Sequence, residues 1–384
     1  GQQLGHFLLL QKQGHGVLLR TRQKYRVSIA SGRWLENAGR LRYNGLTHAR
    51  EGLPAMRPRA FVTRQIFPEA LDLIAREADL EVWPGEYPPT PEQLHQKLAN
   101  VQGVLTNIMD RVDASALNAA PQLKVISQLG VGLDNVDVAE ATRRGILVGH
   151  IRGVLAAATA DLAFALLMAA ARRVSEGERW VRGGQWRLAF HPMHWLGVNV
   201  HGATLGIVGL GEIGLEMAKR ARGFDMKVLY HSRTRKQDLE ARYGLEYADL
   251  PTLLAASDFI SLHVPLTPET RHYIGERQLR MMKPTAILIN ASRGPVVDPR
   301  ALYAALKEGW IRAAALDVTD PEPIPADHPL LTLENLVVTP HIGSASQETR
   351  RATFLLAARN LVAGLKGQPL ECCANPEVYQ AKGT

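Results

Sequence analysis

Three side chains suited to acid–base and charge-stabilising chemistry follow three late apolar segments of the sequence: Arg293, Glu322 and His341. An imidazole can give a proton to a carbonyl oxygen, a neighbouring carboxylate favours the protonated ring, and a guanidinium stabilises negative charge on that oxygen. Singly, each has an ordinary explanation: a solvated arginine, a surface glutamate between prolines and a structural histidine. If the three segments are strands of one doubly wound sheet, the side chains face one crevice. Together they suit the reduction of a carbonyl group.

A glycine-rich hexapeptide, GLGEIG at 209–214, indicates where a hydride donor would bind. It follows an apolar strand, opens a helix and precedes a second strand, which is the context of a dinucleotide site. Gly209 permits the tight turn, Gly211 lets the backbone approach a pyrophosphate, and Gly214 lets helix and strand pack closely. The free N–H groups of the helix N-terminus favour the anion. A glycine-rich turn without a ligand is the alternative.

The strand after this helix ends in basic residues where NAD sites carry an acid. KVLYH (227–231) runs into Ser232, Arg233, Arg235 and Lys236. A carboxylate there would bind ribose hydroxyls and repel a 2′-phosphate, whereas Ser232 can donate one hydrogen bond and the arginines present forked cationic donors. The pattern favours NADP(H), with NAD(H) as the weaker alternative; a solvated basic turn is the ordinary explanation.

The segments that position these residues alternate between short apolar runs and amphipathic stretches. This alternation predicts parallel α/β structure. In the first part we expect helices starting near Pro68, Pro91 and Asp113 and a long helix over 157–174. The strands expected there are RAFVT (59–63), GVLT (103–106), KVIS (124–127) and GILV (145–148).

The second part repeats the alternation and predicts a complete doubly wound sheet. A helix is expected over 345–366, followed by a short polar tail. The expected strands are TLGIVG (204–209), KVLYH (227–231), DFISLHV (258–264), TAILIN (285–290), IRAAALDV (311–318) and NLVVT (335–339).

Composition excludes several functional classes. The 384 residues are 46% hydrophobic and 21% charged, as in ordinary globular protein. Residues 1–55 hold +7 of the net charge of +8, so a nucleic-acid surface is not expected. The apolar stretch 162–171 is too short to cross a membrane. Two adjacent cysteines, Cys372 and Cys373, form neither a disulfide framework nor a metal site and favour a reducing compartment.

The first 55 residues show no sustained period, so we expect an extension without a fold, with the folded chain starting at Met56 and located in the cytoplasm. An Arg-rich, acid-poor leader for an organelle is the alternative.

From Met56 to about Glu377 the sequence resembles the D-isomer-specific 2-hydroxyacid dehydrogenases, most closely their glyoxylate/hydroxypyruvate reductase branch. The motifs that carry the resemblance are GLGEIG (209–214), HVPLTPET (263–270), INASRGPVVD (289–298), ALDVTDPEP (315–323) and TPHIGSAS (339–346).

The resemblance implies roles for residues at matching positions. Arg293, Glu322 and His341 would form the catalytic triad, and Val131 and Gly132 would offer backbone N–H groups to a substrate carboxylate. The implied substrate is a small 2-oxo acid, reduced to the D-2-hydroxy acid by a homodimer. The cofactor-binding positions are Thr159, Gly209, Gly211, Glu212, Ile213, Gly214, Ser232, Arg233, Arg235, His263, Pro265, Asp317 and Gly343.

The implied fold is a Rossmann-type doubly wound parallel sheet inserted in a flavodoxin-like α/β substrate domain. Residues 56–156 would form the substrate domain, 157–339 the dinucleotide-binding domain, and 340–384 a segment returning to the substrate domain.

The sequence departs from the family in two places. HIRGVL (150–155) stands where the family reads like NTPDVL, so Arg152 replaces a proline and the stiffness of the hinge is in question. Thr159 still matches. In the reductase branch, a tryptophan near residues 180–195 reaches the active site of the partner subunit. The aromatic positions of this chain are shifted by one residue relative to the branch, so Trp186, Phe190 and Trp195 are equal candidates for that role.

Rival functions remain at this stage. A nucleotide-sensing corepressor would keep the fold, but such proteins carry long disordered tails and an NAD-type acid. The formate dehydrogenase branch has Gln at the position that Glu322 occupies in this chain, which disfavours that function. A phosphoglycerate dehydrogenase would normally prefer NAD, which the basic residues after 231 disfavour. The apolar loop 107–109 favours a small substrate such as glyoxylate or hydroxypyruvate, and longer 2-keto aldonic acids stay open.

Overall fold

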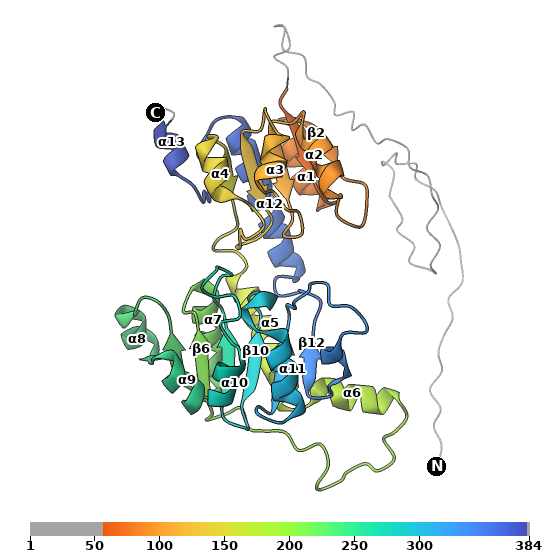
Figure 1. Ribbon diagram of the computed structural model, residues 1–384, viewed down its shortest axis with the longest axis vertical. Coiled ribbons are helices and arrows are strands. Elements are labelled where there is room, and N and C mark those ends of the chain that lie inside the picture. The colour runs from red at the N-terminus through yellow and green to blue at the C-terminus, as the bar shows by residue number, and fades with distance from the viewer. Residues whose placement is uncertain (1–56, 382–384) are drawn as a thin grey trace, which may run out of the picture. The chain divides into compact units, whose positions relative to one another are not determined.

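The computed structural model describes residues 57–381, which form two parallel α/β sheets (Figure 1). The predicted extension 1–55 and start at Met56 lie outside the described residues.

The first sheet has five strands in the order β2-β1-β3-β4-β5. This is the flavodoxin order, and it was expected only from the resemblance. Its strands are β1 (Arg59–Val62), β2 (Asp79–Val82), β3 (Gly103–Thr106), β4 (Val125–Gln128) and β5 (Leu147–Gly149). Its helices are α1 (Pro68–Ala75), α2 (Pro91–Leu98), α3 (Ala114–Asn118) and α4 (Val138–Arg143), joined by the late helix α12 (Gln347–Leu365).

Alternation along the strands divides the core of this sheet between two faces. Phe61, Val104 and Ile126 pack toward α2, α3 and α4, whereas Val62 and Leu105 pack toward α1 and α12. Helix α12 is drawn blue among the orange elements of this sheet in Figure 1, although it follows the second sheet in the sequence. The chain therefore returns to its first sheet after completing the second.

The second sheet has seven strands in the order β12-β11-β10-β9-β6-β7-β8. The strand order reverses between β6 and β9, as in dinucleotide-binding folds. The strands are β6 (Thr204–Val208), β7 (Lys227–His231), β8 (Glu246–Tyr247), β9 (Phe259–Leu262), β10 (Ile287–Asn290), β11 (Ala313–Leu316) and β12 (Leu336–Val338). The helices are α5 (Ala156–Ala171), α6 (Val174–Arg182), α7 (Glu212–Ala221), α8 (Gln237–Tyr243), α9 (Leu250–Ala256), α10 (Glu276–Met281) and α11 (Pro299–Lys307).

Two buried clusters cover the faces of the second sheet. Leu205 and Ile289 pack with α5 and α7, while Ile260 and Leu288 pack with α9, α10 and α11. Because all the strands are parallel, their carboxyl ends share one edge, and the loops that follow them carry the candidate site.

The expected α/β class and doubly wound sheet are confirmed. The long helix expected over 157–174 is wrong at its end: α5 stops at Ala171 and α6 begins at Val174, because Arg173 takes a left-handed φ of 55°. The sequence analysis also missed β2, β8, α4 and α13 (Glu377–Ala381), all of which are short.

Every helix between residues 57 and 381 is too short or too polar to cross a membrane.

Candidate active site

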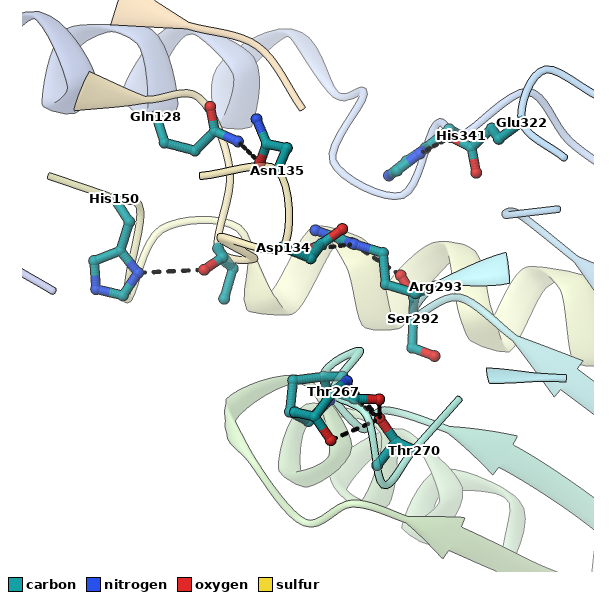
Figure 2. A network of polar contacts seen from close by, with 12 residues as sticks. Gln128, Asp134, Asn135, His150, Thr267, Thr270, Ser292, Arg293, Glu322 and His341 are labelled. Atoms are coloured by element: carbon teal, nitrogen blue, oxygen red, sulfur yellow. Dashed lines mark hydrogen bonds and ion pairs between the residues drawn. The ribbon is translucent and has the colours of Figure 1, made fainter. Parts of the chain in front are cut away.

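His341 and Glu322 come together behind the last strands of the second sheet. Glu322 follows β11, His341 follows β12, and Glu322 Oε1 lies 2.5 Å from His341 Nδ1 (Figure 2). The backbone N–H of His341 donates to the Asp317 carbonyl at 2.9 Å, which holds the residue at its left-handed φ of 53°. With Nδ1 engaged, Nε2 is the ring atom left to act on a ligand.

Arg293 follows β10 and reaches the first sheet. Its Nε donates to Asp134 Oδ1 at 3.0 Å, and Nη1 donates to the Ser292 carbonyl at 3.0 Å (Figure 2). The other guanidinium nitrogen lies against Gly132, where a Cβ would stand 2.1 Å from Nη2. The backbone of Gly132 and the charge of Arg293 therefore occupy one corner of the site.

A polar network holds the loop that contains Val131 and Gly132. The Asn135 side chain accepts from Gln128 Nε2 at 2.6 Å and donates to the carbonyls of Asn107 at 3.1 Å and Asp110 at 2.7 Å. It thereby ties the loop after β4 to the loop after β3. Sequence reasoning missed this support, although the side chains lie at the ends of strands that it predicted.

The glycine-rich loop has the form that a dinucleotide site requires. Gly209 has a φ of 100°, and a Cβ on Gly214 would stand 2.2 Å from the Gly209 carbonyl oxygen. Gly211 caps α7, and among residues 57–381 nothing lies within 4 Å of an added Cβ, so this side of its backbone is open to a ligand. The N–H groups of α7 are available to an anion at this point. These residues fit a nicotinamide dinucleotide.

Buried polar groups border the same loop. Burial lowers the pKa of His263 to about 4, so its ring is neutral at pH 7. Its Nε2 lies 2.8 Å from Ser261 Oγ, while Nδ1 is buried and has no hydrogen-bond partner in the described part of the chain. Asp317 is also buried; it accepts from Thr339 Oγ1 and from the N–H groups of Ile342 and Gly343.

The basic residues after β7 differ in their availability. Two nitrogens of Arg235 donate to Glu240 at 2.8 Å each, and the pKa of Glu240 falls to about 2 because of these bonds and one from Tyr230. Ser232 Oγ donates to the Thr234 carbonyl at 2.7 Å. Arg233 has no hydrogen-bond or ion-pair partner within residues 57–381. The residues predicted to select the cofactor thus follow one strand, but the Arg235 side chain is held by Glu240 of α8.

A cavity of about 420 Å³ joins most of these parts. Glu322 stands behind His341 rather than in the lining, and neither Gly209 and Gly214 nor the residues after β7 border it. The predicted site residues that line it are Val131, Gly132, Thr159, Gly211, Glu212, Ile213, His263, Pro265, Arg293, Asp317, His341 and Gly343. Sequence reasoning missed Asp134, Arg350, Thr353 and Phe354, which also line it.

Arg152, which replaces the family's proline, pairs with the first residue of α7. Its Nη2 lies 3.2 Å from Glu212 Oε1, and the N–H of Gly153 donates to Glu212 Oε2 at 3.1 Å. An ion pair therefore connects the hinge to the glycine-rich loop. Both side chains are well exposed, so its contribution to stability is small.

The aromatic residues between 180 and 195 form no buried cluster. Trp186 and Phe190 are exposed, and Trp195 packs edge-on against Trp180 with ring centroids 5.3 Å apart. Within residues 57–381, no three His, Cys, Asp or Glu side chains are grouped to hold a metal ion.

Comparison with known proteins decides the family. Residues 164–343 match the model of the D-isomer specific 2-hydroxyacid dehydrogenase, NAD binding domain. The glyoxylate reductase of Korarchaeum cryptofilum is 51% identical over 327 residues, which are 85% of this chain and 98% of that protein. The chain belongs to the D-isomer-specific 2-hydroxyacid dehydrogenase family. Within the family it lies in the glyoxylate reductase branch, as the sequence motifs indicated.

Solved structures agree with this assignment. The TT0316 protein of Thermus thermophilus is 44% identical with a TM-score of 0.77, covering 82% of this chain and 99% of its own. The NADPH-dependent glyoxylate/hydroxypyruvate reductase of Sinorhizobium meliloti, solved with NADP and malonate, is 32% identical with a TM-score of 0.74, covering 83% and 97%. A nicotinamide dinucleotide is the cofactor that the family and the glycine-rich loop both support.

The open space at Gly211 yields a test of cofactor binding. Gly211→Ala should raise the dissociation constants of NADPH and NADH by about tenfold or more, because a methyl group would occupy the space of the pyrophosphate. The unfolding temperature should change little. Gly223→Ala, which also meets no neighbour but lies away from the cavity, is the matched control. Fluorescence titration measures the dissociation constants of both cofactors in each variant. Equal affinities in Gly211→Ala and Gly223→Ala would mean that the dinucleotide does not bind at Gly211.

Proposed function

We propose that this chain reduces a small 2-oxo acid, glyoxylate or hydroxypyruvate, to the D-2-hydroxy acid with NADPH. The observation that carries the proposal is the convergence of the His341–Glu322 pair, Arg293 and the open face of Gly211 on one cavity. When bound, the dinucleotide supplies the hydride.

The substrate's carboxylate binds at the corner formed by Val131, Gly132 and Arg293. The contact between Arg293 and Gly132 supports this, because it offers a guanidinium and backbone N–H groups at one place. Arg293 also polarises the carbonyl group and stabilises the charge that develops on its oxygen. In this assignment, residues 56–156 with the 340–384 segment form the substrate domain, and 157–339 form the dinucleotide domain.

His341 gives its Nε2 proton to the carbonyl oxygen. Glu322, at 2.5 Å from Nδ1, orients the ring so that Nε2 faces the cavity. In the oxidation direction the neutral ring accepts the proton.

The triad assignment predicts the behaviour of two variants. His341→Gln should lower kcat by about 100-fold or more, the contribution expected of a general acid, while NADPH binding is retained. Glu322→Gln should cause a smaller loss, because the side-chain amide oxygen can still accept from Nδ1 and orient the ring. His201→Gln, outside the cavity, is the control. Steady-state rates with glyoxylate measure the effect; undiminished turnover in His341→Gln would remove the residue from the mechanism.

The preference for NADPH rests on the end of β7. Within residues 57–381 Arg233 forms no hydrogen bond or ion pair, although its charge helps to lower the pKa of Glu269. Ser232, whose hydroxyl donates to the Thr234 carbonyl, stands where NAD sites hold an acid. Arg235 is committed to Glu240 through two bonds, so Arg233 is the principal contact for the 2′-phosphate.

Selector variants test this preference. Replacing Ser232 with Asp and Arg233 and Arg235 with Ala should raise the KM for NADPH far more than that for NADH. Arg233→Ala alone should raise it about tenfold, the cost of losing a charged hydrogen bond, and Arg235→Ala should do less. KM values for both cofactors in each variant decide the matter. A parallel rise for NADPH and NADH would mark the stretch as an ordinary basic turn.

A second copy of the chain would cover the exposed apolar segment that follows α6. Its large apolar side chains, Trp186 and Phe190 among them, are exposed, and an exposed apolar surface is typical of an interface. The homodimer and a cytoplasmic location complete the proposal.

A further inference from the structure

Two side chains on the first turns of α12 face the cavity with polar atoms that lack partners. Arg350 and Thr353 both line it. Arg350 Nε and Thr353 Oγ1 are buried from solvent, and within residues 57–381 neither has a hydrogen-bond partner. Residues three apart share one face of a helix, so the two groups lie side by side. A buried polar atom without a partner is costly, which makes a missing ligand the natural explanation.

Among residues 57–381, no carboxylate forms an ion pair with Arg350. Burial lowers the pKa of its guanidinium, and Asp317 is the acid whose charge acts in the opposite sense. Both oxygens of Asp317 are already taken, Oδ1 by Thr339 Oγ1 and the Ile342 N–H, and Oδ2 by the Gly343 N–H. The next residue, Arg351, shows the ordinary situation: its Nε lies 2.9 Å from Glu69 Oε1 on α1. The N–H donors of the Arg350 guanidinium are therefore available to a ligand in the cavity.

The polar atoms of the substrate show what these donors can bind. On the proposed function, a 2-oxo acid places its carboxylate at Gly132 and Arg293 and its carbonyl oxygen at His341. Glyoxylate has no further polar atom. Hydroxypyruvate has one, the hydroxyl on C3, and its two lone pairs and one hydrogen suit a guanidinium and a threonine hydroxyl.

We propose that Arg350 and Thr353 bind the C3 hydroxyl of a 3-hydroxy-2-oxo acid and so determine the choice among substrates of this site. The inference rests on the proposed function. A site built to hydrogen-bond a hydroxyl discriminates strongly against an analogue without it, because its own polar groups are then left unpaired. Pyruvate, which carries a methyl group in place of CH₂OH, is such an analogue.

The test compares three substrates in four proteins. The proteins are the full chain, Arg350→Met, Thr353→Val, and Arg351→Met as the matched control, which removes a neighbouring arginine outside the cavity. The substrates are glyoxylate, pyruvate and hydroxypyruvate at saturating NADPH. In Arg350→Met and Thr353→Val, kcat/KM for hydroxypyruvate should fall by about tenfold or more, as expected for a lost hydrogen bond in a buried site. The values for pyruvate and glyoxylate should change by less than about threefold, and Arg351→Met should match the unaltered chain.

Within each preparation, kcat/KM for hydroxypyruvate is divided by kcat/KM for pyruvate. Inactive, misfolded protein lowers both values equally, so it does not change this ratio. A constant ratio in Arg350→Met and Thr353→Val would overturn the inference while leaving the proposed function intact. A raised KM for NADPH in these variants would also overturn it, because the two residues would then serve the cofactor. Absence of turnover with all three substrates in the unaltered chain would overturn both proposals.

Discussion

The contact between Arg293 and the loop of Gly132 and Asp134 is the constraint on which the site depends. Arg293 follows a strand of the seven-stranded sheet, and Asp134 follows a strand of the five-stranded sheet, so their 3.0 Å ion pair joins the carboxyl edges of two separate sheets. The pair is only partly exposed, and removing Asp134 would leave the guanidinium without its orienting partner. Gly132 must lack a side chain for the approach to occur. The cavity that His341 borders is bounded by this contact.

Satisfied and unsatisfied polar groups in the cavity and after β7 differ in their roles. Glu322 with His341, Asp134 with Arg293, and Glu240 with Arg235 are closed pairs, and each fixes the direction of a reactive or charged side chain. Other polar groups, Arg350, Thr353 and His263 among them, have buried atoms with no partner in the described residues. The paired side chains are thus held in fixed orientations, while the unpaired atoms can still form hydrogen bonds with a ligand. This is the pattern expected of a preorganised site, in which the reacting groups are already oriented before the reaction and need to move little during it.

Much of the fold follows from the apolar segments, because buried parallel strands are continuous runs such as GVLT and AILIN. The edge strand β2 was missed since DLEV alternates and is half exposed, and the break before α6 was missed since nothing in Arg172–Arg173 forbids a helix. The convergence of Arg293 and His341 on one cavity was predictable from strand ends alone, and so was the nearness of Glu322 to His341. Asp134 and Arg350 were not predictable. Asp134 matters because of its contact with Arg293, more than a hundred residues away, and Arg350 because its Nε has no hydrogen-bond partner within residues 57–381. The pairing of Arg235 with Glu240, five residues later, also requires coordinates.

The rate of NADPH oxidation by the purified chain in the presence of glyoxylate tests the central claim most directly. We predict turnover of the usual enzymatic order, ~1–1000 per second, with a lower kcat/KM when NADH replaces NADPH. NADPH that binds yet is not oxidised with glyoxylate, hydroxypyruvate or any other small 2-oxo acid would contradict the account. That result would favour a protein that senses the nucleotide without using it.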